Sequence, residues 1–141
     1  MHINLEQVKY FYMIASMTLE LPNCVIPKIT VHKKVISKPF RRLLDSYNRN
    51  CVDSPPEFSD DYLVRAARSL INYDWKQAYE YLITQKKLFT GPNAATVIST
   101  LETRLKETAL KVYILKGQQY FESFTMEKLS SQFGLDKDII R

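Results

Sequence analysis

The sequence contains few of the residues on which many catalytic and ligand-binding sites depend. Its 141 residues include 3 glycines, 2 cysteines and 2 histidines. The stretch "GPNAAT" has one glycine where a phosphate-cradling loop needs several, so it indicates the start of a helix. The cysteines and histidines lack the close spacing of a zinc site, and neither histidine has a neighbouring nucleophile signature. We therefore predict no catalytic residue, metal or cofactor, and no small-molecule substrate.

Long apolar runs and a secretion signal are also missing. The most apolar stretches, such as "FYMIASMTLEL", are too short and too quickly interrupted for a membrane span. No basic start, apolar run and small-residue cleavage site marks a signal peptide. Apart from Cys24 and Cys51 nothing suggests an oxidising compartment, so we interpret both as reduced thiols. The sequence predicts a cytoplasmic protein with no membrane partner.

The composition and the apolar spacing indicate one globular, all-α chain. Hydrophobic residues make up 45% and charged residues 25% of the sequence, which is enough apolar surface for a core. Residues 3–21 read as a helix capped by Asn4 and ended by Pro22. Apolar residues fall on both of its sides, so both sides are expected to be covered. One row is Leu5, Val8, Tyr12, Ala15 and Leu19, and the other is Phe11, Ile14, Met17 and Leu21.

Further helices follow in quick succession. A second begins near Ser37 or Lys38 with Pro39 in its first turn, and the connector "NCVDSPPEF" is a loop. A helix capped by Ser59 or Asp60 and one capped by Asp74 then form a close antiparallel hairpin of the solenoid type. We expect Trp75 to be buried at the hairpin corner, where its replacement by alanine would cost about 3–5 kcal/mol. After "TGP", a helical stripe continues for about five turns. Its apolar residues are Val97, Leu101, Leu105, Ala109 and Val112.

The last stretch, "FTMEKLSSQFGLDKDIIR", has the pattern of a helix-turn-helix. Thr125 can cap its first helix, Gly134 suits a left-handed stop and Asp136 can cap its second helix. The second helix is short, so we expect the module to be incomplete and part of its apolar set to be exposed. That set is the predicted subunit interface: Leu129, Phe133, Leu135, Ile139 and Ile140.

Positive charge is concentrated between Lys28 and Arg49. This segment has seven Lys and Arg residues against one acidic residue, while the whole chain carries a formal charge of +5. Such a segment can hold RNA phosphates through counterion release without reading base sequence. An acidic protein neighbour and a merely solvated face are the alternatives. The predicted contact residues are Lys33, Lys34, Lys38, Arg41 and Arg42.

Several of these stretches together resemble one family in the same order and with similar spacing. They are "INLEQVKYFYMIASMTLELP", "HKKVISKPFRRLL", "SPPEFSDDYLVRAARSLINYDWKQAYEYLI" and "LKETALKVYILKGQQYFESFTMEKLSSQFGLD". The family is the C subunit of eukaryotic translation initiation factor 3, and the resemblance covers nearly the entire chain. The sequence departs from the family at Ser54 and Tyr73, where glycine is usual, and "LKGQQYFES" differs from the family's serine- and tyrosine-rich pattern.

The resemblance implies a PCI domain, which is a helical repeat followed by a winged helix. Residues 1–119 would form the helical-repeat part and residues 120–141 the start of a winged helix that continues in the family. It also implies a non-catalytic scaffold subunit of the initiation factor, with other PCI subunits and the small ribosomal subunit, including its rRNA, as partners. A PCI scaffold of the proteasome lid or signalosome is the alternative. A DNA-binding regulator is a weaker one, because Asp136 and Asp138 lie where a base-reading helix needs donors.

Overall fold

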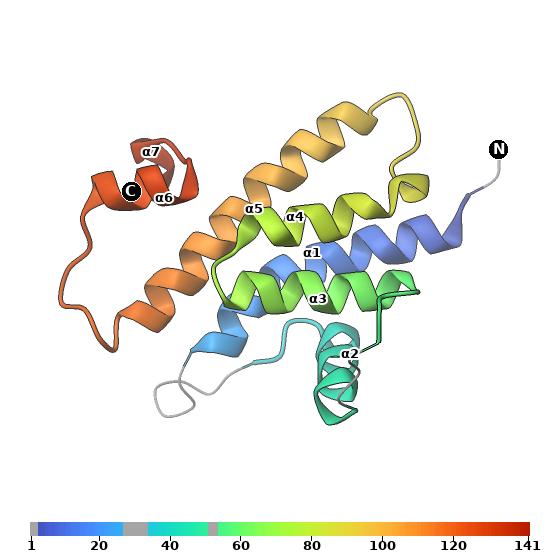
Figure 1. The fold of residues 1–141 in the computed structure, drawn as a ribbon, viewed down its shortest axis with the longest axis horizontal. Helices are drawn as coiled ribbons and strands as arrows, with labels where there is room; N and C mark the ends of the chain where they lie inside the picture. Colours follow the sequence, from blue (N-terminus) through green and yellow to red (C-terminus); the bar gives the residue numbers. More distant parts are fainter. Residues whose placement is uncertain (1–2, 27–33, 51–53) are drawn as a thin grey trace.

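The computed structural model describes residues 3–26, 34–50 and 54–141, and every regular element in these ranges is a helix (Figure 1). This confirms the prediction of an all-α chain. The elements are α1 (Leu5–Val25), α2 (Lys38–Arg49), α3 (Ser59–Ile71), α4 (Trp75–Thr84), the 3-10 helix η1 (Lys86–Leu88), α5 (Ala94–Gly117), α6 (Met126–Phe133) and α7 (Lys137–Ile140).

Four helices form the main bundle. α1 packs against α3 and α5, and the α3–α4 hairpin packs against α5 (Figure 1). α2 lies beside this group and contacts α1 and α3. α6 packs against α5 and α7, so the C-terminal helices lie to one side of the bundle. α2, which belongs to the basic segment, and the C-terminal helices are thus attached to different parts of the same bundle.

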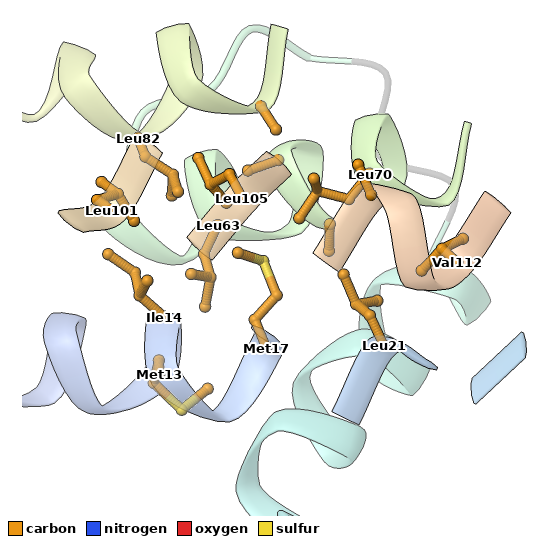
Figure 2. Close-up of a cluster of buried hydrophobic side chains, with 14 of the residues drawn as sticks. Met13, Ile14, Met17, Leu21, Leu63, Leu70, Leu82, Leu101, Leu105 and Val112 are labelled. Atoms are coloured by element: carbon orange, nitrogen blue, oxygen red, sulfur yellow. The ribbon is translucent and has the colours of Figure 1, made fainter. Parts of the chain in front are cut away.

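The bundle core is built from aliphatic and thioether side chains of α1, α3, α4 and α5 (Figure 2). Removing such a side chain from water contributes about 1.5–3 kcal/mol relative to leaving it exposed. Because four helices supply the residues, each helix depends on the other three for its cover. The fully buried members include Met17, Leu21, Leu63, Leu70, Leu82, Leu105 and Val112.

The two helices of the α3–α4 hairpin pack closely against each other, as their small residues predicted. Ala66, Ala67 and Ala78 are all fully buried, which lets the two helices approach each other. The corner contains Tyr73, whose φ of 68° lies in the left-handed region where glycine costs least. The Tyr73 ring packs edge-on against Tyr113 of α5, with 5.2 Å between ring centroids. The ring contact with Tyr113 thus stabilises Tyr73 in a backbone conformation that is strained for tyrosine and would not be strained for glycine.

The two sides of α1 differ, which corrects the expectation that both are covered. Ile14, Met17 and Leu21 are buried, and Phe11 packs against the core. The other row faces outward, and its four large members, Leu5, Val8, Tyr12 and Leu19, are 79%, 55%, 54% and 59% exposed. We call Leu5, Val8, Tyr12 and Leu19 the outer row of α1.

Pro22 does not end α1, contrary to the prediction. The helix continues to Val25, although proline lacks the N–H that would bond to the carbonyl four residues earlier. Tertiary contacts support this last turn. Cys24 and Val25 pack against the core, and the Asn23 side-chain amide donates to the carbonyl of Lys34 at 3.2 Å.

Several helices begin at the predicted residues, but not every predicted cap forms. Thr125 and Asp136 occupy the N-cap positions of α6 and α7 without a capping hydrogen bond from their side chains. Asn4, Ser37 and Asp74 cap α1, α2 and α4 with side-chain oxygens, as predicted. At α3, however, the N-cap is Phe58 and not Ser59 or Asp60. Its backbone amide is bound instead by the carboxylate of Asp61, three residues further on, at 3.0 Å.

Trp75 is only partly buried, so the prediction of a core tryptophan is wrong. Its ring packs against the edge of the core, and the Lys106 ammonium lies 4.6 Å from the ring centroid. Lys106 is also paired with Glu102 at 2.7 Å. Since the ring is only partly buried and an ammonium group covers part of it, its removal would cost less than the loss of a fully buried tryptophan.

Candidate nucleic-acid interface

The cations predicted to contact RNA occupy the segment before α2 and the first two turns of α2. Lys34, Lys38 and Arg42 are exposed. We call these three residues the outer cations. No described carboxylate lies within ion-pair distance of any of them. Lys33, which belongs to the predicted set, lies outside the described residues, as does Lys28.

Arg41 differs from its neighbours because it is partly buried and paired with a carboxylate. Its Nε donates to Oε1 of Glu20 at 2.6 Å. Burial is the largest single influence and works against the charged guanidinium, but the hydrogen bond to Glu20 and the nearby negative charges together outweigh this cost and raise the pKa of Arg41. The structure therefore separates Arg41 from the outer cations.

Glu20 connects this basic segment to α1. The side chain is fully buried, and its Oε2 accepts hydrogen bonds from the backbone amides of Ile36 and Ser37 at 2.9 and 3.0 Å. With Arg41, one carboxylate thus binds three donors, as a buried charge requires. The sequence analysis missed Glu20. Its one signal was an acidic residue within the apolar stretch "FYMIASMTLEL".

The start of α2 is fixed from inside as well. The Ser37 hydroxyl caps the helix by accepting from the Phe40 amide at 3.4 Å, and Pro39 fits the first turn. Phe40 is fully buried, so the inner side of the first turn is anchored in the core. Lys38 and Arg42, one turn apart, are consequently held on the outer side.

The other end of α2 is fixed to α3 by a partly buried contact. The Tyr47 hydroxyl donates a hydrogen bond to Oδ1 of Asp61, whose Oδ2 accepts from the amides of Glu57 and Phe58. Burial and this hydrogen bond raise the pKa of Tyr47 to about 12. Burial disfavours the ionised form of Asp61, but its three hydrogen bonds prevail and lower its pKa. α2 is therefore attached at both ends, which gives the outer cations a defined position.

The predicted subunit interface divides in the structure. Leu129, Phe133 and Leu135 are 4%, 0% and 6% exposed, so they are covered within the chain and not available as a surface. The Phe133 ring packs against Tyr113 of α5 at 5.6 Å between centroids. Of the five residues, Ile139 is open at 49% exposure, and Ile140 is partly buried.

The turn between α6 and α7 has the predicted geometry. Gly134 is left-handed with φ 62°, and its amide donates to the Ser130 carbonyl at 2.9 Å. At the link from α5 to α6, a Cβ at Gly117 would lie 2.8 Å from the Phe124 ring, so a larger residue there would displace this ring. The two short helices are thus positioned by specific backbone features.

The described residues bring together no cluster of three or more His, Cys, Asp or Glu side chains that could hold a metal. Cys24 is partly buried, whereas Cys51, His2 and His32 lie outside the described residues. Within the ranges that the structure describes, no helix is both long and apolar enough to cross a membrane.

Comparison with known proteins identifies relatives along the whole chain. No family model matches the sequence. The chain is 34% identical over 145 residues to the C subunit of eukaryotic translation initiation factor 3 from Mycosarcoma maydis, covering 100% of this chain and 16% of that protein. It is 31% identical to the protein of the same name from Schizosaccharomyces pombe, covering 96% of this chain and 15% of the relative. The Caenorhabditis briggsae protein is 29% identical over 143 residues. The chain therefore spans about a sixth of the length of the curated relatives it matches.

Proposed function

We propose that the chain acts as a non-catalytic scaffold segment of eukaryotic translation initiation factor 3, because it is homologous over its whole length to the C-terminal part of the C subunit of that factor. In this function it supports assembly of the factor and its docking on the small ribosomal subunit during translation initiation, in the cytoplasm. The observation that carries the proposal is the similarity to the Mycosarcoma maydis protein over 100% of the chain.

The fold agrees with this function. The helical bundle is of the PCI type that the resemblance predicted. We assign residues 1–119 to the helical-repeat part and residues 120–141 to the start of a winged helix. The sharp Gly134 turn between α6 and α7 supports the second assignment.

The exposed end of α7 is the part of the C-terminal helices that we assign to other PCI subunits of the factor. Ile139 is half exposed and Ile140 is next to it. Leu129, Phe133 and Leu135 instead support this surface from inside.

The outer cations are the part that we assign to the small ribosomal subunit. Exposed lysine and arginine side chains with no carboxylate partner can replace counterions along an RNA backbone. Among the described residues, Lys34, Lys38 and Arg42 meet this condition, so we propose that they contact rRNA phosphates. An acidic protein neighbour would use the same charges and is the alternative.

Two other functions are less well supported. The names of the relatives favour the initiation factor over the proteasome lid or the signalosome. A DNA-binding regulator would need donors at the start of its recognition helix, whereas the first turn of α7 presents the exposed carboxylate of Asp138 next to Asp136.

The test is to tag the protein in its own cells and to identify what co-purifies with it. We expect other initiation factor 3 subunits and rRNA of the small subunit. A variant with K34E, K38E and R42E should keep the factor subunits and lose the ribosomal component. The matched control reverses three exposed lysines elsewhere, Lys86, Lys87 and Lys111, and should lose neither.

Absence of initiation factor subunits from the purified material would overturn the proposed function, and subunits of the proteasome lid or signalosome in their place would establish the alternative. Equal loss of ribosomal RNA in both triple variants would overturn the specific role of the outer cations.

A further inference from the structure

We propose that Glu20 is a positioning residue of the RNA-contacting surface: it holds Arg41 in an ion pair and fixes α2, so that Arg42 and not Arg41 contacts phosphate. The inference rests on the proposed RNA contact of the outer cations. It distinguishes two adjacent arginines that the sequence presents as equivalent.

Glu20 is held in place by the donors around it. Its carboxylate is fully buried and accepts from three donors, which are the amides of Ile36 and Ser37 and the Nε of Arg41. The two amides belong to the segment just before α2, and Arg41 belongs to the first turn of that helix. One side chain of α1 therefore sets both the path of the basic segment and the start of α2.

Arg41 could pair with Glu20 or with an RNA phosphate, and these two contacts differ in free energy. The Arg41 side chain is 28% exposed, and its Nε is held by Glu20. To turn its whole guanidinium toward a phosphate, Arg41 would have to leave Glu20, which would then lose its charged partner while remaining buried. A buried charge without its partner is strongly disfavoured, whereas a phosphate contact at the surface is screened by salt. Arg41 therefore stays with Glu20 when RNA binds.

Arg42 is free of any such internal contact. It follows Arg41 directly on the same helix, but its side chain is exposed and has no described carboxylate partner. Residues next to each other on a helix point about 100° apart, so a helix held by its inner side presents Arg42 outward. The contrast between the two arginines thus follows from the anchoring of α2.

The experiment measures binding of the whole protein to a labelled oligouridine over a salt series. The slope of log K against log salt is negative, and each phosphate contact with a single strand adds about 0.7 to its magnitude. R42Q should lower this magnitude by about 0.7, and R41Q should leave it unchanged. E20Q should raise it by about 0.7, because Arg41 is then released to the surface. K111Q removes an exposed charge on α5 and controls for net charge.

R41Q alone leaves Glu20 without its partner and could disturb the fold. The double variant E20Q/R41Q removes both charges together and should show the slope of the unchanged protein. Hydrogen exchange at the Ile36 and Ser37 amides provides a second readout, and it should become faster in E20Q but not in R42Q.

The outcomes separate the inference from the function on which it rests. If the double variant or R41Q lowers the magnitude of the slope as much as R42Q does, Arg41 contacts RNA and the inference is wrong, while the RNA contact stands. If the unchanged protein binds oligouridine with no dependence on salt, the RNA contact itself is wrong and the inference fails with it.

Discussion

The helical bundle and the C-terminal helices are held in different ways. α1, α3, α4 and α5 enclose a shared aliphatic core to which every helix contributes (Figure 2). α6 and α7 are attached to one side, where Tyr113 of α5 meets both Phe124 and Phe133 with 5.8 and 5.6 Å between ring centroids. The bundle depends on many distributed contacts, and the attachment of α6 depends heavily on one aromatic cluster.

This difference implies that the two regions respond separately to mutation. Loss of one core residue should weaken all four helices of the bundle, because each is covered by the others. Loss of one ring at Tyr113 should release α6 and α7 and leave the bundle folded. The predictions below test this separation, and with it the proposed division between residues 1–119 and 120–141.

The largest effect on the bundle is expected for Leu63→Ala. Leu63 is fully buried between helices, so its truncation removes apolar contact and leaves a cavity, which typically costs about 2–5 kcal/mol. Denaturant unfolding followed by circular dichroism measures the loss. The control is Leu19→Ala in the outer row of α1, which should change the free energy of unfolding by less than about 0.5 kcal/mol. Similar losses for both would mean that Leu63 does not lie in the shared core.

Phe133→Ala should affect the bundle less than Leu63→Ala does, but it should have a large effect on α6 and α7. The phenyl ring is fully buried against Tyr113, and its loss should expose α6 to fraying. Hydrogen exchange should become fast in residues 126–140 while residues 59–84 keep their protection. The exposed Ile139→Ala serves as the comparison and should leave both regions protected. Faster exchange throughout the bundle would show that the two regions unfold together.

The smallest effect concerns acid and the contact between α2 and α3. Asp61 has a lowered pKa in the folded protein, so it contributes stability above its unfolded value of 3.8 and loses that contribution as the pH falls through the lower folded value. Asp61→Asn should cost about 1 kcal/mol at neutral pH, as for a lost helix cap, and less at pH values below the folded pKa. The free energy of unfolding of both proteins, measured at neutral pH and in acid, checks this. A larger loss of stability in acid than at neutral pH would contradict it.

The local features of the fold were predictable from the sequence because they depend on neighbouring residues. A cap such as Asn4 or Asp74 binds amides two or three residues away, and Gly134 stops α6 through its own backbone conformation. The small residues of the α3–α4 hairpin also lie close together in the sequence. In each case the physical cause falls within one short window.

The features that the sequence did not predict depend on contacts between distant residues. Periodicity places Leu5 and Ile14 on different sides of α1, but it does not say which side another helix covers. Trp75 was expected in the core because of its size, yet its ring meets Lys106, which lies 31 positions later. Pro22 was expected to end α1, and packing of the following turn overrode this local preference.

The candidate interface was predictable in its charge and not in its arrangement. A count of lysine and arginine was sufficient to locate the basic segment. The pairing of Arg41 with Glu20 joins residues 21 positions apart, so nothing in the local pattern separates Arg41 from Arg42. The burial of Leu129 and Phe133 was missed for the same reason, because α5 covers them.

The outer row of α1 has a practical consequence for handling the protein. Apolar side chains that project into solvent promote association when molecules approach, and net charge of one sign keeps the molecules apart. At pH 7 the formal charge of +5 provides this repulsion, but the isoelectric point of about 9.2 means that it vanishes in mildly alkaline buffer. We therefore expect the protein to be least soluble near pH 9.2, with light scattering rising there first, and to be best kept in buffers below neutral pH.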